Sequence, residues 1–153
     1  MEQFYYEDTA VVENADADCH SLLKASALLR YVEQITAVHA RKFGMDDQFF
    51  EDHGVAFLVG KQALRFNRVP RRGETLTLCS RSEKILRGSI KRITTLTDEA
   101  GQEVAMVDSR WIMSSLEDGH ILRQPDWTVE GYWNDTVEEE LPLLLHKRRD
   151  SLT

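Results

Sequence analysis

The chain has few of the features that mark special protein classes. Of its 153 residues, two are cysteines, Cys19 and Cys79, and three are prolines. Two cysteines are too few for a disulfide framework and lack the paired spacing of a zinc site, so we interpret both as reduced thiols. No apolar run approaches the roughly 20 residues that a membrane-spanning helix requires, and the acidic N-terminal residues do not resemble a secretory signal. We therefore expect no membrane span and a cytoplasmic protein.

The net charge of −7 argues against nucleic acid as a partner, because affinity for a duplex depends on neutralising its phosphates with Lys and Arg. Positive charge is nevertheless concentrated between Lys61 and Arg92, and Arg65, Arg68 and Arg71 lie within this segment. Such a segment can bind an acidic partner or the phosphates of a cofactor. The alternative is that these residues occupy solvated strand and turn positions.

Several catalytic motifs are missing. The chain has no glycine-rich phosphate loop and no Gly-x-Ser-x-Gly nucleophile motif, and its five histidines lack metal-ligand spacing. We therefore expect neither a metal nor a bound cofactor. Cys19 lies beside Asp18 and His20, but nothing in the sequence indicates a reactive thiol, and adjacent loop side chains seldom face each other.

One long amphipathic helix is predicted over residues 21–43. Apolar residues recur there at three- and four-residue spacing and share one arc of the helix; they include Ala25, Leu28, Val32 and Ile35. We expect Asp18 or Ser21 to cap the N-terminus and Gly44 to end the helix. A short second helix is predicted at residues 46–52.

Strands account for most of the remaining pattern. A first strand is predicted within residues 4–12, and alternating apolar residues predict further strands at 55–66, 75–80, 90–97 and 104–114. The apolar parity changes near Gly60, which predicts a bend or a β-bulge there. Residues 98–101 form a hairpin loop, and the last strand is apolar on both faces, as a central or doubly covered strand would be. One helix with an antiparallel sheet defines an α+β domain. We expect it to span residues 1–125, with residues 126–153 as an extension of uncertain structure.

The chain resembles the hot-dog fold acyl thioesterases, most closely the N-terminal half of acyl-acyl-carrier-protein thioesterases. The resemblance covers about residues 4–125 and depends on an ordered set of short matches. The set comprises Tyr6 with Glu7, Asp18, Glu33, His39, Gly54 with Phe57 where Trp is common, Pro70 with Gly73 and Glu74, Asp98 with Gly101, and Ser109 with Trp111.

This resemblance implies a sheet wrapped around the helix, acyl-chain pockets between the two, and active sites at a dimer interface. Members usually carry two hot-dog domains in one chain. For this chain we expect a homodimer or homotetramer to replace the tandem pair.

Asp18 and Glu33 are the predicted catalytic residues, because single-domain relatives often use an acidic residue in the loop before the helix or on the helix. Asp18 would act as general base or nucleophile, while amides around His20 to Leu23 polarise the thioester carbonyl. Alternatively, Asp18 only caps the helix. Glu33 lies at the margin of the apolar arc, which predicts partial burial; the alternative is solvation or pairing with Arg30 or Arg41.

The predicted substrate-binding residues are His20, His39 and Phe57, together with Arg65, Arg68 and Arg71 for carrier acids or cofactor phosphates. His39 lies at the centre of the apolar arc and is therefore expected in the interior, where it either serves the substrate or bonds a backbone carbonyl or a carboxylate.

Our leading hypothesis is a thioesterase that hydrolyses a fatty or related acyl thioester carried on acyl carrier protein or coenzyme A. The alternative is a non-catalytic acyl-binding or assembly module. A hot-dog dehydratase or hydratase is less favoured, because the chain lacks the histidine-containing motifs of both groups.

Overall fold

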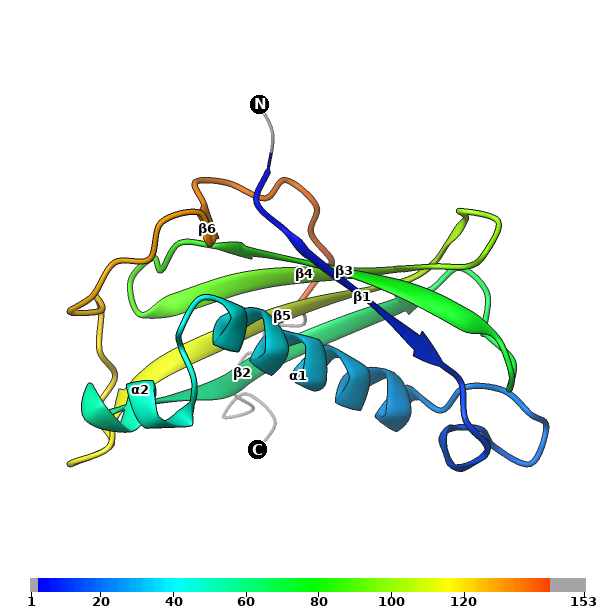
Figure 1. The fold of residues 1–153 in the computed structure, drawn as a ribbon, viewed down its shortest axis with the longest axis horizontal. Coiled ribbons are helices and arrows are strands. Elements are labelled where there is room, and N and C mark those ends of the chain that lie inside the picture. The colour runs from blue at the N-terminus through cyan, green and yellow to red at the C-terminus, as the bar shows by residue number, and fades with distance from the viewer. Residues whose placement is uncertain (1–2, 144–153) are drawn as a thin grey trace, which may run out of the picture.

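The computed structural model describes residues 3–143, and these form one curved antiparallel sheet with a long helix across one face (Figure 1). The strands are β1 (Tyr6–Val11), β2 (Val55–Phe66), β3 (Thr75–Glu83), β4 (Ser89–Thr97), β5 (Glu103–Ser115) and the short β6 (Trp133–Asn134). The helices are α1 (Ala25–Lys42) and α2 (Asp47–Asp52), preceded by a 3-10 turn at Asn14–Asp16. The predicted α+β class, with a sheet wrapped around one long helix, is confirmed.

The strand order is β1-β3-β4-β5-β2, and β6 adds a short parallel pairing to β3. The long strands β3, β4 and β5 pair as neighbours because tight turns connect them. The register between β2 and β5 shifts between Val59 and Lys61, so the predicted bulge at Gly60 is confirmed. β2 forms one edge of the sheet, and Leu58 and Val59 on it are 57% and 42% exposed.

The main core lies between α1 and the sheet. Leu28, Val32 and Ile35 of the helix pack against buried residues of three strands, among them Leu76 and Leu96. These residues match the predicted apolar arc and the alternation along the strands. Burial of this apolar face stabilises the helix more than its intrinsic propensity does.

The outer face of the sheet has a smaller core formed by the segment that follows β6. Val137 and Leu141 pack there against Ile93 and Met106. The carboxylate of Asp108 accepts a hydrogen bond from the Leu141 amide at 3.1 Å, which fixes this segment to β5. The prediction that the last long strand is covered on both faces is therefore confirmed for this part of β5.

The helix start differs from the prediction. α1 begins at Ala25, its N-cap residue is Lys24, and no side chain caps it. The prediction that Asp18 or Ser21 caps the helix is therefore wrong. Residues 17–23 form a loop that pairs with the β2–β3 connection, because the Leu23 amide bonds the Pro70 carbonyl at 2.8 Å.

Candidate functional site

A cavity of about 630 Å³ lies between the C-terminal half of α1, α2 and the inner face of the sheet. Its walls are mainly apolar and come from elements distant in sequence: Ala40, Met45, Phe50, Val55, Phe57, Ile90, Trp111 and Trp133. A cavity of this size and polarity matches the usual character of small-ligand sites. Phe57 was predicted as a substrate-binding residue, and it lines this cavity.

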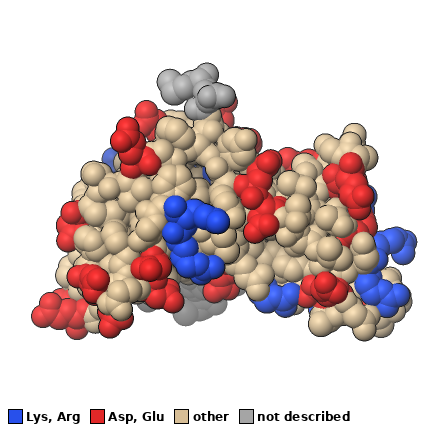
Figure 2. Space-filling view, viewed as in Figure 1, with Lys and Arg blue, Asp and Glu red and all other residues tan. Residues whose placement is uncertain are grey.

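Acidic side chains mark the rim of the cavity. Glu33 of α1 and Asp47 and Glu51 of α2 line it, and all three are exposed. Figure 2 shows acidic residues gathered over the α2 end of the molecule, at the left. The opening of the cavity therefore carries negative charge, whereas no acidic side chain lines its buried end.

Arg92 of β4 lines the cavity and is only 3% exposed. Its Nη1 donates to Ser80 Oγ at 2.7 Å and to His39 Nδ1 at 3.1 Å, and its Nη2 donates to the hydroxyl of Tyr132. No carboxylate among residues 3–143 pairs with this guanidinium. A buried cation without a counter-ion is costly, so it calls for a physical reason.

His39 is fully buried in the last turn of α1, against the same guanidinium. Its ring stacks on Tyr6 with centroids 5.6 Å apart and packs on Tyr132 at 4.3 Å. Burial, and secondarily the charge of Arg92, lower the pKa of His39 to about 3. The imidazole is therefore neutral, with Nδ1 as the acceptor and the proton on Nε2.

Buried side-chain donors without a partner among the described residues include Arg92 Nε, Nε2 of its neighbour His39, and Nε1 of Trp111, which lines the same cavity. Buried polar groups are normally paired, and unpaired ones often mark functional positions. The interior position predicted for His39 is confirmed. The prediction that it bonds a backbone carbonyl or a carboxylate is wrong, because its Nδ1 contacts the guanidinium of Arg92.

Asp18 lies in the exposed loop before α1, away from the residues that line the cavity. Its Oδ1 accepts from the amides of His20 at 2.8 Å and Leu22 at 3.1 Å. These bonds, chiefly that from Leu22, hold the pKa of the Asp18 carboxyl below its usual value. The predicted use of these amides for a thioester carbonyl is wrong for this conformation, because they bind Asp18 itself and α1 begins later.

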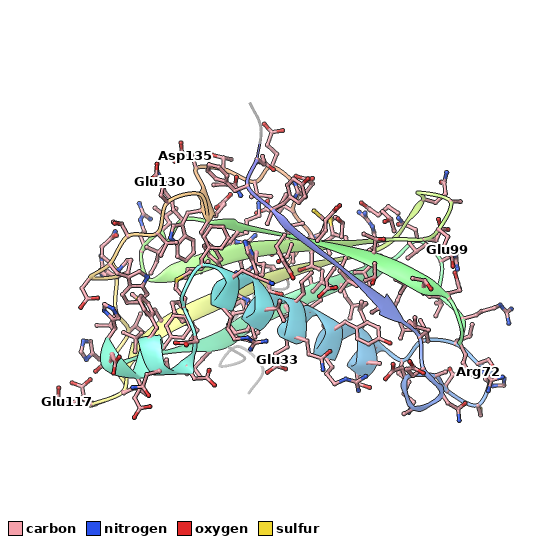
Figure 3. All side chains as sticks on the ribbon, viewed as in Figure 1. Glu33, Arg72, Glu99, Glu117, Glu130 and Asp135 are labelled. Carbon is pink, nitrogen blue, oxygen red and sulfur yellow. The ribbon has the colours of Figure 1, made fainter. Side chains whose placement is uncertain are left out.

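Glu33 and the loop of residues 17–23, called the Asp18 loop below, are far apart: Glu33 lies within α1, and the loop precedes it. Figure 3 shows Glu33 projecting from the middle of the helix, while Arg72, hydrogen-bonded through its amide to Ser21, lies at the far end. The predicted partial burial of Glu33 is wrong, because the residue is exposed. It forms no ion pair with Arg30 or Arg41, since Arg30 instead pairs with Asp16.

The predicted basic residues are mostly neutralised by neighbouring carboxylates. Arg65 pairs with Glu103 at 2.8 Å, and Arg68 pairs with Glu74 at 2.6 Å and with Asp98 at 3.0 Å. Arg71 is exposed, and its backbone bridges to Leu22 beside the Asp18 loop. The segment therefore offers less free positive charge than its sequence indicated.

Arg92 is not among the predicted site residues, although it lies at the end of the basic segment. It alternates with Ile90, Thr94 and Leu96 on the inward face of β4, and all four are buried. A single charge on an otherwise inward-facing strand surface was the available signal. Within residues 3–143, no cluster of three or more His, Cys, Asp or Glu side chains is arranged to hold a metal. In the same range, no helix is long and apolar enough to cross a membrane.

The model of the acyl-ACP thioesterase N-terminal domain family matches residues 3–132. The chain belongs to this family. No curated protein matches the chain in sequence.

Solved structures of three thioesterases share the fold. An acyl-ACP thioesterase from Bacteroides thetaiotaomicron superposes with a TM-score of 0.80 and 16% identity, over 90% of this chain and 57% of that one. A Lactobacillus plantarum protein assigned as an oleoyl thioesterase superposes with a TM-score of 0.75 and 21% identity, over 78% of this chain and 46% of that one. A 1,4-dihydroxy-2-naphthoyl-CoA thioesterase from Synechocystis superposes with a TM-score of 0.72 and 13% identity, over 79% of this chain and 90% of that one. The chain thus spans about half the length of the first two, and the predicted hot-dog fold is confirmed.

Proposed function

We propose that this protein is a thioesterase that hydrolyses a fatty or related acyl thioester carried on acyl carrier protein or coenzyme A. The observation that carries the proposal is the apolar cavity of about 630 Å³ between α1, α2 and the sheet, in a chain of the acyl-ACP thioesterase family. Burial of each methylene group of an acyl chain there contributes roughly 0.8 kcal/mol. The cavity therefore supplies affinity for the chain, while its rim leaves the thioester near solvent.

Catalysis is proposed to use a carboxylate, and Glu33 is better placed than Asp18 for a chain bound in this cavity. Glu33 lies on the rim, where the thioester of a bound acyl group would emerge. A carboxylate there serves as base for a water or as nucleophile, because the thiolate leaves readily. Asp18 belongs to the loop at the other end of α1, so its proposed role requires a site completed by another domain or a second copy.

The free edge of the sheet supports such an assembly. β2 is long, lacks a neighbour on its outer side among residues 3–143, and exposes Leu58 and Val59. An exposed apolar edge strand favours pairing with another chain. We propose a homodimer or homotetramer that uses this edge. Light scattering on Leu58→Lys should report a smaller assembly than the unaltered chain; an unchanged mass contradicts the use of β2.

The carrier is proposed to dock at the Asp18 loop, through Arg71. This guanidinium has no side-chain partner among the described residues, unlike those of Arg65 and Arg68. A free Arg suits the phosphates of coenzyme A or the acidic surface of a carrier protein. We also propose a cytoplasmic location, which the two free cysteines support.

The direct test measures thiol release from acyl-CoA and acyl-carrier-protein substrates of increasing chain length. We expect Glu33→Gln to lower kcat at least about tenfold, since it removes the base or nucleophile but keeps the shape. Asp18→Asn tests the second carboxylate in the same way. Glu99→Gln, in the exposed β4–β5 hairpin, is the matched control for loss of one surface carboxylate.

A second candidate, a non-catalytic acyl-binding module, is favoured by one observation: Asp18 bonds its own loop and lies apart from the cavity. Saturable binding of acyl thioesters without thiol release on either carrier would select this function over hydrolysis.

A further inference from the structure

The buried end of the cavity contains one unbalanced positive charge. Arg92 is 3% exposed and bonds only neutral groups, namely Ser80, Tyr132 and the uncharged His39. Its Nε–H has no partner within the described part of the chain. Burial of a cation that bonds only neutral groups is unfavourable for the fold, so its presence here calls for another explanation.

A second unpartnered donor belongs to a residue that lines the same cavity from the adjacent strand. Trp111 of β5 pairs in register with Ile90, two residues from Arg92 on the same face of the sheet. Both Trp111 and Arg92 line the cavity, and neither Trp111 Nε1 nor Arg92 Nε has a partner there. A purely hydrocarbon occupant would keep these donors buried and unpaired, which is unfavourable.

The charge distribution points to a singly charged acceptor. One guanidinium balances one negative charge, and the apolar walls at Met45, Val55 and Phe57 suit an aliphatic body. A carboxylate offers two oxygens with about four acceptor sites, whereas a doubly charged phosphate would exceed the single cation present. The acidic groups of the cavity lie on its exposed rim, so they do not occupy this position.

We propose that the buried end of the cavity is a carboxylate site, in which the guanidinium of Arg92 binds the carboxylate of an aliphatic chain that fills the cavity. Two carboxylates have this chemistry: that of the free acid after hydrolysis, bound again with its chain reversed, or one at the far end of an acyl chain whose thioester lies at the rim. That the occupant is an acyl chain rests on the proposed function. The preference for a carboxylate does not, because binding is measurable without hydrolysis.

The test compares dodecanoate with 1-dodecanol, which has the same chain length and no charge. Trp111 and Trp133 line the cavity, so their fluorescence reports binding of either probe. We expect dodecanoate to bind about 10- to 100-fold more tightly than 1-dodecanol, as expected for a charge-assisted hydrogen bond. Equal affinities in the unaltered protein would overturn the proposal.

Variants of Arg92 assign the preference to its side chain. Arg92→Met should abolish the preference for dodecanoate, and Arg92→Lys should retain most of it. Thr94→Val, a near-isosteric change two residues along the same buried face, is the matched control and should leave it unchanged. A preference that survives in a folded Arg92→Met protein refutes the assignment. If that variant does not fold, Arg92→Gln and the comparison of the two probes on the unaltered protein still decide the outcome.

Thioether analogues of dodecanoyl-CoA, with and without a terminal carboxylate, separate the two sources. Tighter binding of the carboxylated analogue, lost in Arg92→Met, places the carboxylate on the substrate. A preference confined to free dodecanoate assigns the site to the released acid. Absence of both preferences contradicts the proposal, whereas failure of the thiol-release assay contradicts only the proposed hydrolysis.

Discussion

The buried, neutral His39 predicts that the protein loses stability in mild acid. Its imidazole is 0% exposed, and its pKa lies at about 3, because of burial and the nearby Arg92 charge. In an unfolded chain the pKa of histidine is about 6.5. Between these values the unfolded chain binds a proton that the folded protein excludes, so the free energy of unfolding decreases as the pH falls below about 6.5.

The size of the effect follows from one proton. Each pH unit below the unfolded pKa changes the free energy of unfolding by up to about 1.4 kcal/mol, so the loss between about pH 7 and pH 5 is about 2 kcal/mol. The titratable or charged groups that face the ring are Arg92, Tyr6 and Tyr132. Carboxyl groups with lowered pKa values, such as that of Asp16, change the free energy of unfolding mainly below about pH 5.

His39→Gln isolates this contribution, since its amide oxygen still accepts from Arg92 but does not titrate. We expect urea unfolding, followed by tryptophan fluorescence, to show a flatter dependence on pH for His39→Gln than for the unaltered protein. His20→Gln removes an exposed imidazole and is the matched control, which should keep the steeper dependence. Identical slopes for His39→Gln and the unaltered protein would refute the reasoning.

Two further predictions concern stability. Tyr31→Phe removes the hydroxyl that donates to buried Asp16 Oδ2 at 2.5 Å and should lower the free energy of unfolding by about 1.5–3 kcal/mol in urea titrations; a loss near zero would show that this bond is dispensable. Gly88→Ala forces a side chain to adopt φ near +81° with its Cβ 3.1 Å from the Leu122 carbonyl, so it should cost more than the roughly 1–2 kcal/mol of a left-handed residue alone. Gly119→Ala has a similar φ and open space, and an equal loss in both variants would contradict the role of the contact.

The fold was largely predictable because local patterns and global packing agree. The apolar arc of α1, the alternation along β3 to β5 and the parity change at Gly60 each correspond to an observed element. The elements match because one face of each is buried, and burial fixes both period and register.

The site was less predictable because it depends on contacts between distant segments. The Asp18 loop pairs with the β2–β3 connection, which moves the helix start to Ala25, and no local pattern reveals that pairing. Arg92 meets His39 across 53 residues of sequence, and cationic residues are usually exposed. Its inward position on β4 overrides that tendency.

The most direct test of the central claim is the chain-length profile of thiol release when the cavity is partly filled. Ala40 of α1 is 8% exposed and lines the cavity, so Ala40→Leu shortens the space open to an acyl chain. Ala100→Leu, in the exposed β4–β5 hairpin, is the control. We predict that the preferred acyl thioester becomes shorter in Ala40→Leu and unchanged in Ala100→Leu. If no acyl thioester on either carrier releases thiol, or if both variants have the same chain-length profile, the claim that this protein is a thioesterase whose cavity binds the acyl chain is contradicted.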